Sequence, residues 1–190
     1  MMFNSERKVH CFGDNINTDI IISGKYLRTK NEEIFKEHIF ETIKGEGYFK
    51  KIDNGDVILG GFNFGCGSSR EQAALAIKYA GFKIVIAKSY GRIFYRNIIN
   101  QGILTLNINE ESFSDTNKIK DSDKVVIDMQ SSLAIFGNTK LRFEKPSSFL
   151  LEIIQAGGLL NYAKEKDSNN SRRWHLQGNI SFDNKNNGEA

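Results

Sequence analysis

The stretch that decides the fold is residues 56–108, which read DVILGGFNFGCGSSREQAALAIKYAGFKIVIAKSYGRIFYRNIINQGILTLNI. Short apolar segments of strand length alternate here with longer segments of helical length. Strands are predicted at 56–59, 83–87 and 103–108, and helices from the serines 68–69 to Ala80 and from a capping Ser89 to about Asn100. Strands that alternate with helices over short links imply parallel pairing, so the sequence predicts an α/β fold.

The flanking segments add further strands to this core. Residues 8–12 form a predicted first strand, and Asn31 is placed to cap a short amphipathic helix. Later the pattern changes to KVVID at 124–128, followed by SLAIF and KLRFE, which Gly137-Asn138 joins in a predicted β-hairpin. The sheet should therefore be mixed and only partly parallel.

The chain ends in a helical region and a polar tail. The single proline, Pro146, precedes a helix predicted at 147–166 and interrupted at Gly157-Gly158. Residues 167–190 are rich in Asn, Ser and Gly, with Trp174 as the one large aromatic residue. We expect one domain over residues 1–166 and a C-terminal tail, 167–190, that is flexible or rests on a partner.

Composition and charge narrow the class of protein. Of the 190 residues, 39% are hydrophobic and 26% charged, as in a soluble globular domain. No apolar run approaches the roughly 20 residues of a membrane-spanning helix, and residues 1–10 lack the apolar core of a secretory signal. We therefore expect a cytoplasmic protein. A net charge of +3 with scattered basic residues gives no basic stripe for nucleic acid.

The possible metal ligands are sparse. Cys11 and Cys66 are far apart in the chain, and the three histidines, His10, His38 and His175, are dispersed. This pattern argues against a disulfide scaffold and against a structural zinc site. A cubane iron–sulfur cluster typically needs three or four thiolates, so any such cluster must be held by another chain.

The glycine-rich segment 60–71, GGFNFGCGSSRE, is the best candidate for a binding site. Serines at the start of a helix place backbone N–H groups where an anion can bind. Arg70 would lie in the first helical turn, where the helix dipole disfavours a cation unless it binds a carboxylate. The other interpretation, a capping serine beside a solvent-exposed arginine, stays open. Nucleotide-binding loops do not fit, because the Gly-Lys-Ser/Thr ending is missing.

A serine in such a position can also act as a base. Backbone donors and a neighbouring cation stabilise an alkoxide, which can remove a proton from carbon beside a carboxylate. That is the first half of a β-elimination of water, and the second half usually needs a Lewis acid. The sequence therefore offers the base for this reaction, but no convincing site for the Lewis acid.

Four motifs resemble a known family. They are GDNINTD at 13–19, KYLRT at 25–29, NFGCGSSRE at 63–71 and RIFYRN at 92–97. Together they resemble the swivelling domain of the aconitase superfamily, above all the separate small subunit of 3-isopropylmalate dehydratase and homoaconitase. The resemblance runs in order from about Lys8 to Lys166.

The resemblance implies a β/β/α swivelling domain and a set of roles. Ser68 would be the catalytic base, Ser69 and Arg70 would bind substrate, and Asp19 would lie at the rim of the site. A large partner subunit would hold a 4Fe–4S cluster, and this chain would bind no metal. The substrate would be a small hydroxy di- or tricarboxylate, isomerised by dehydration and rehydration. Gln72 departs from the family, in which many members have histidine at this position.

Arg28 bears on the choice of substrate. An isopropyl group favours an apolar neighbour, whereas a third carboxylate favours a cation, so Arg28 points toward homoaconitate. The alternative is a loop arginine that faces solvent. Because 3-isopropylmalate enzymes are the commoner members with this architecture, leucine biosynthesis comes first and homoaconitase second.

Other residues and other classes of protein stay open. Arg92 and Arg96, four apart on one helix, face acidic groups of the large subunit or water. Phe94, Tyr95, Ile98 and Ile99 are predicted to pack in the core, and Cys66 to fill space. Rival interpretations are a non-catalytic, anion-binding regulatory module and a metal lyase that is active alone.

Overall fold

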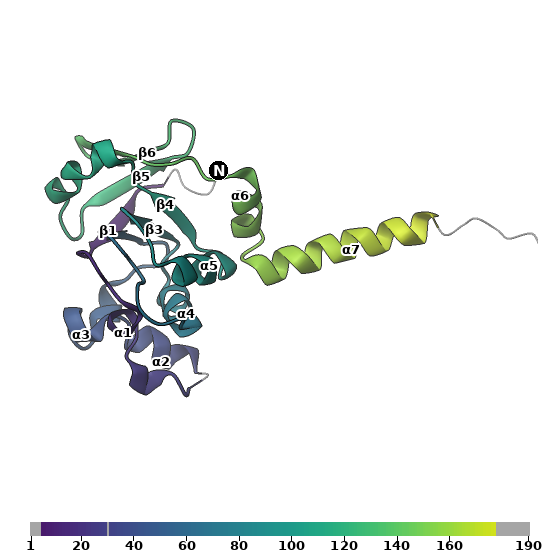
Figure 1. Cartoon of the computed structure of the whole chain (residues 1–190), viewed down its shortest axis with the longest axis horizontal. Helices are drawn as coiled ribbons and strands as arrows, with labels where there is room; N and C mark the ends of the chain where they lie inside the picture. The colour runs from purple at the N-terminus through teal and green to yellow at the C-terminus, as the bar shows by residue number, and fades with distance from the viewer. Residues whose placement is uncertain (1–4, 30, 178–190) are drawn as a thin grey trace, which may run out of the picture.

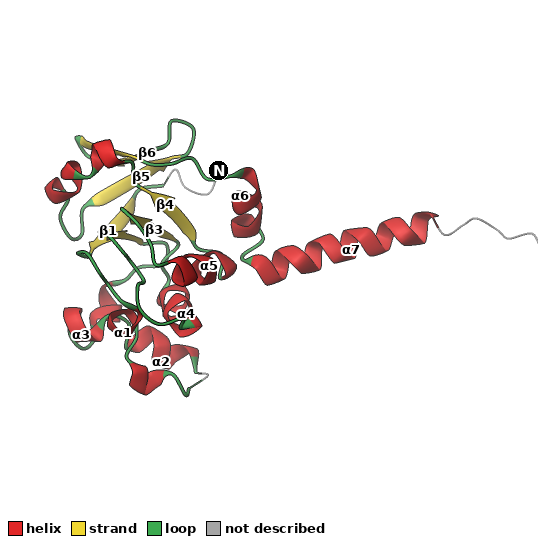
Figure 2. Ribbon diagram, in the orientation of Figure 1, coloured by secondary structure: helices red, strands yellow, loops and turns green. Residues whose placement is uncertain are grey.

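The computed structural model describes residues 5–29 and 31–177. The chain forms one seven-stranded sheet in the order β4-β3-β2-β1-β5-β6-β7. Its strands are β1 Arg7–Cys11, β2 Val57–Gly60, β3 Ile84–Ala87, β4 Leu104–Asn107, β5 Lys124–Asp128, β6 Leu133–Phe136 and β7 Thr139–Arg142. Strands β1 to β4 are parallel, and β5 to β7 are antiparallel, so the predicted mixed sheet is confirmed (Figure 2).

Most helices connect the parallel strands. The α-helices are α1 Thr18–Ile21, α2 Glu32–Glu37, α3 Glu41–Lys44, α4 Glu71–Ala80, α5 Arg92–Asn100, α6 Ser148–Gln155 and α7 Leu159–Gln177. The 3-10 helices are η1 Gly24–Tyr26, η2 Tyr48–Lys51, η3 Glu110–Ser112 and η4 Ser114–Lys118. Asn31 caps α2 by accepting from the N–H of Glu33, and Gly81 ends α4 with φ +102°, both as predicted.

The parallel strands are buried on both faces, because each face has its own apolar core. Ile58 and Val85 pack with α1, α2, α4 and α5, whereas their neighbours Leu59 and Ile86 face β5 to β7. Figure 1 shows helices α1 to α5 below the parallel strands and β5 and β6 above these strands. The near-continuous apolar sequence of these strands follows from this double coverage.

The sheet curls until its two ends meet. The end of β4 pairs with the end of β7 through an antiparallel bridge between Ile108 and Phe143. The N–H of Asn109 donates to the Arg142 carbonyl at 2.9 Å, and the N–H of Glu144 donates to the Asn107 carbonyl at 2.8 Å. The antiparallel hairpin thereby covers the face of the parallel sheet that the helices leave open.

Helix α7 extends away from the rest of the molecule (Figure 1). It runs from Leu159 to Gln177, so the predicted boundary at residue 166 lies inside a helix. The predicted interruption at Gly157-Gly158 separates α6 from α7. Residues 178–190 of the predicted tail lie outside the described residues, as does the side chain of Trp174.

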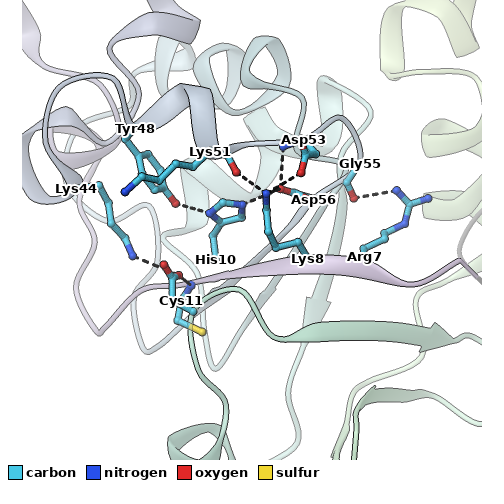
Figure 3. Close-up of polar contacts among 11 residues, drawn as sticks. Arg7, Lys8, His10, Cys11, Lys44, Tyr48, Lys51, Asp53, Gly55 and Asp56 are labelled. Atoms are coloured by element: carbon cyan, nitrogen blue, oxygen red, sulfur yellow. Dashed lines mark hydrogen bonds and ion pairs between the residues drawn. The ribbon is translucent and has the colours of Figure 1, made fainter.

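A buried polar network joins β1 to the segment before β2 (Figure 3). His10 is 2% exposed; its Nε2 lies 2.8 Å from Asp56 Oδ2, and its Nδ1 lies 2.6 Å from the Tyr48 hydroxyl. Lys8 Nζ lies 3.4 Å from the same Asp56 oxygen and 2.7 Å from the exposed Asp53. Burial raises the pKa of Tyr48 well above its ordinary value, so its hydroxyl stays protonated.

Candidate active site

Three loops meet at the carboxyl ends of β1, β2 and β3. Backbone hydrogen bonds join the first two: Asn15 N–H to the Phe62 carbonyl at 2.7 Å, and Gly65 N–H to the Ile16 carbonyl at 2.7 Å. The second and third loops are joined where Phe64 N–H donates to the Ser89 carbonyl at 3.0 Å. The carboxyl ends of parallel strands are the usual place for ligands in such sheets.

Side chains reinforce these loops. Asp14 Oδ1 accepts from the Phe62 N–H at 2.8 Å, and Ser89 Oγ accepts from the Asn63 N–H at 2.8 Å. The prediction that Ser89 caps the following helix is therefore wrong: α5 begins at Arg92, with Gly91 at its N-cap. The Ser89 hydroxyl instead ties the loop after β3 to the glycine-rich loop.

Ser68 and Ser69 precede helix α4 rather than begin it. The helix starts at Glu71, and Arg70 is its N-cap in an extended conformation with φ −68° and ψ 112°. The predicted start at the serines is wrong, because Arg70 is still extended and the backbone just before the serines pairs with the first loop, at the bridge between Asn17 and Cys66. At the N-cap, Arg70 lies at the positive end of the helix dipole, where a carboxylate partner is needed to offset the repulsion.

Ser68 is held by a residue that the sequence analysis missed. Thr18 Oγ1 lies 3.1 Å from Ser68 Oγ and 3.4 Å from the Ser68 carbonyl oxygen. Thr18 is fully buried, whereas Ser68 is exposed. Thr18 stands beside Asp19 in the motif at 13–19, so the motif pointed to this part of the chain. Only the fold shows that Thr18 contacts Ser68.

Arg70 pairs with Asp19, the next residue along α1. The ion pair joins Arg70 Nη1 to Asp19 Oδ1, with the arginine side chain 25% exposed and the aspartate 56% exposed. Gly24 lies against this pair: a Cβ there would stand 3.6 Å from Asp19 Oδ1 and 3.8 Å from Arg70 Nη1. The structure therefore brings Ser68, Arg70 and Asp19 together around the first turn of α1.

Two other predicted substrate-binding residues, Ser69 and Arg28, are exposed. Within the described part of the chain, neither side chain has a hydrogen bond or ion pair. Arg28 follows η1, the segment that Gly24 begins beside the Arg70–Asp19 pair. Gln72, the departure from the family pattern, lies half-buried in the first turn of α4. The roles of Ser69 and Arg28 stay predictions.

The side chains available here do not form a metal site. Among residues 5–29 and 31–177, no group of three His, Cys, Asp or Glu side chains is placed to hold a metal ion. Cys11 lies in β1 and Cys66 in the glycine-rich loop, and both thiols are free. This set of residues does not fit a cubane cluster. No helix of the described chain has the length and apolar character needed to cross a membrane.

Helix α5 packs beneath the site and exposes its other side. Phe94 and Ile98 are buried, as predicted, whereas Tyr95 and Ile99 are only half-buried. A side chain at Gly65 would overlap the ring of Phe94. Arg92 and Arg96 are exposed on the opposite side of the helix. Their predicted contact with a partner stays a prediction.

Comparisons with known proteins show the family of this chain. Residues 5–111 match the aconitase C-terminal domain family. The methanogen homoaconitase small subunit of Methanocaldococcus jannaschii is 46% identical, over 84% of this chain and 91% of the relative. The 3-isopropylmalate dehydratase small subunit 1 of Archaeoglobus fulgidus is 45% identical, over 80% of this chain and 92% of the relative.

A solved structure shows the same fold. The crystal structure of 3-isopropylmalate dehydratase from Methanocaldococcus jannaschii matches with a TM-score of 0.79 and 44% identity, over 88% of this chain and 98% of that chain. The resemblance drawn from the four motifs and the predicted aconitase-like fold are both confirmed. The chain belongs to the aconitase C-terminal domain family.

Proposed function

We propose that the chain is the small subunit of a heteromeric hydro-lyase, which isomerises a small hydroxy di- or tricarboxylate by dehydration and rehydration. Its similarity to small subunits of such enzymes over most of their length supports this proposal. In this proposal, the 4Fe–4S cluster is bound by the large subunit, and the described residues of this chain offer no group of three His, Cys, Asp or Glu side chains for it. The chain alone should be inactive.

One observation carries the proposal. Ser68 and Arg70 are held by two consecutive residues, Thr18 and Asp19, so the hydroxyl and the guanidinium lie over the same turn of α1. A base and a carboxylate-binding cation so close together suit a substrate whose reacting carbon is next to a carboxylate. The exposure of Ser68 leaves that group open to a ligand.

The proposed roles follow from the chemistry of each group. Ser68 takes the proton from the carbon beside the carboxylate, and a hydroxyl of Thr18 that donates to Ser68 Oγ stabilises the alkoxide. Arg70 binds the carboxylate with two parallel N–H donors. Ser69 supplies a further donor. Asp19 keeps the guanidinium in place until the substrate binds.

The substrate is proposed to be 3-isopropylmalate, with leucine biosynthesis as the pathway, and homoaconitate is the second candidate. Relatives of similar identity have both names. The observation that favours the second is Arg28, an exposed cation on the segment that begins beside Arg70. A cation suits a third carboxylate better than it suits an isopropyl group.

The base is tested by reconstitution with a large subunit under anoxic conditions, following the absorbance of the alkene intermediate. We expect S68A to lower kcat by about 10² to 10⁴-fold, the usual contribution of a general base. Ser148, exposed at the start of α6, provides the matched control S148A, which should keep full activity. Full activity in S68A would instead favour the non-catalytic, anion-binding module.

The substrate is tested by the variant R28V in the same complex. If Arg28 meets a third carboxylate, R28V should lower kcat/KM on homoaconitate by about 10² to 10⁴-fold, because the carboxylate loses its partner. The value on 3-isopropylmalate should stay the same or rise. An unchanged ratio of kcat/KM between the two substrates would show that Arg28 does not contact the group that differs between them.

A further inference from the structure

The wall of the site next to Arg70 is a short segment, residues 23–29, which contains η1 and Arg28. Gly24 lies against the Arg70–Asp19 pair, so a shift of this segment would change the space beside the guanidinium. Within the described chain, its backbone–backbone hydrogen bonds are local ones, such as Tyr26 N–H to the Ser23 carbonyl at 3.0 Å. The backbone alone therefore does not attach this segment to the rest of the fold.

Besides the packing of Tyr26 against the apolar core, the polar attachment comes from one carboxylate, that of Glu41 in α3. Its Oε1 accepts from the Tyr26 hydroxyl at 3.0 Å and lies 2.9 Å from Lys25 Nζ. Its Oε2 lies 2.6 Å from His38 Nδ1. The ring of His38 stacks on that of Tyr26 with centroids 4.1 Å apart, and Lys25 Nζ lies 4.7 Å from the centre of the Tyr26 ring. Two consecutive residues of η1 thus bind one side chain.

Glu41 is itself well anchored. Its side chain is only 11% exposed, and the preceding residues, Ile39 and Phe40, are fully buried. The Phe40 N–H donates to the carbonyl of Ile21, the last residue of α1, at 2.9 Å. Although partial burial favours a neutral carboxyl, the hydrogen bonds from Lys25, His38 and Tyr26 lower the pKa of Glu41. A charged carboxylate on a rigid element therefore holds a segment that has few backbone anchors.

We infer that Glu41 is a positioning residue, which sets the placement of residues 23–29 beside Arg70 and thereby the choice among hydroxy-acid substrates. This inference rests on the proposed function. Glu41 acts through Lys25 and Tyr26 and does not touch the substrate. Its loss should therefore affect KM and selectivity more than kcat.

The first test uses hydrogen exchange on the full-length chain alone. In E41Q, the amides of residues 23–29 should exchange about tenfold faster than in the unmodified protein, because the neutral amide replaces the carboxylate that binds Lys25, Tyr26 and His38. The matched control is E111Q, which changes a different glutamate ion pair, Glu111 Oε1 to Arg142 Nε at 3.0 Å, distant in sequence from this segment. E111Q should leave the exchange of residues 23–29 unchanged.

The second test uses the complex with the large subunit. E41Q should raise KM by roughly tenfold with kcat changed less than about twofold, and should shift the ratio of kcat/KM between 3-isopropylmalate and homoaconitate. Y26F, which removes only the tyrosine hydroxyl, should shift KM and the kcat/KM ratio in the same direction. If amides throughout β2 also exchange faster in E41Q, that variant is unfolded, and Y26F takes its place in the test. The inference would be overturned if both variants had the same KM as the unmodified complex and the same exchange rates at residues 23–29.

The two proposals fail in different ways. If the unmodified complex converts neither substrate, the proposed function is wrong, and the exchange experiment still decides whether Glu41 holds the segment. If the unmodified complex is active and S68A is not, while E41Q and Y26F behave normally, only the positioning role is overturned.

Discussion

Thr18 and Ser68 are in contact across 50 residues of sequence, with Thr18 Oγ1 3.1 Å from Ser68 Oγ. The threonine is fully buried at the start of α1, while the serine lies on the exposed glycine-rich loop. The N–H of Thr18 also donates to the Cys66 carbonyl at 2.9 Å, which keeps the two loops in register. A buried hydroxyl thus holds an exposed one in a defined place.

The variant T18V tests this contact, since valine has the shape of threonine without the hydroxyl. One neutral hydrogen bond contributes about 0.5–1.5 kcal/mol, so we expect kcat to fall up to about tenfold with KM nearly unchanged. T18S, which keeps the hydroxyl, should retain most of the activity. Equal activity in T18V and the unmodified complex would remove Thr18 from the mechanism.

Gly65 should be required for the loop to fold. Its φ is +75°, and a Cβ there would overlap the ring of Phe94. We expect G65A to lower the free energy of unfolding by about 2–4 kcal/mol, from the left-handed backbone and the overpacking together. Gly13, where a Cβ would meet no atom within 4 Å, gives the control G13A, with a change within about 0.5 kcal/mol. Urea unfolding measures the free energy of unfolding of both variants. Equal losses of stability in G65A and G13A would contradict the requirement for glycine at position 65.

The buried network around Asp56 should be important for stability (Figure 3). Asp56 Oδ2 bonds His10 Nε2 at 2.8 Å and accepts from the Asp53 N–H at 2.9 Å. A buried donor left without its acceptor costs about 1–3 kcal/mol, and D56A removes the acceptor of both His10 and the Asp53 N–H, so we expect a loss of about 2–5 kcal/mol. D53A removes an aspartate whose side chain is 80% exposed and should leave the unfolding midpoint nearly unchanged. Similar unfolding midpoints for the two variants would contradict this ranking.

Cys11 should react slowly. Burial, together with Asp121 and Asp123, outweighs Lys44 and raises the pKa of the Cys11 thiol to about 11. At about pH 8, only about one thiol in a thousand is then ionised, and the thiolate is the reactive form. In C66S, the rate of alkylation by iodoacetamide should rise about tenfold per pH unit up to about pH 10. Mass spectrometry measures this rate, and a plateau below about pH 9 would contradict the raised pKa.

The local patterns predicted much of the fold. The alternation of strands and helices over residues 56–108, the cap at Asn31, the stop at Gly81 and the hairpin at Gly137-Asn138 all depend on neighbouring residues, and the structure confirms them. The starts of two helices were wrong, because Ser68 and Ser89 make contacts with distant loops instead of capping the helices that follow. Capping signals compete with tertiary hydrogen bonds, which sequence alone does not show.

The amino-acid sequence by itself determined the α/β class, the family motifs and the loop that carries Ser68 and Arg70, because these depend on residue type and spacing. Only the tertiary structure decided which groups touch: Thr18 with Ser68, Asp19 with Arg70, and Glu41 with Lys25 and Tyr26. The physical reason is the parallel sheet. It brings the ends of strands far apart in the chain to one edge, and loop residues meet there according to strand order rather than sequence order.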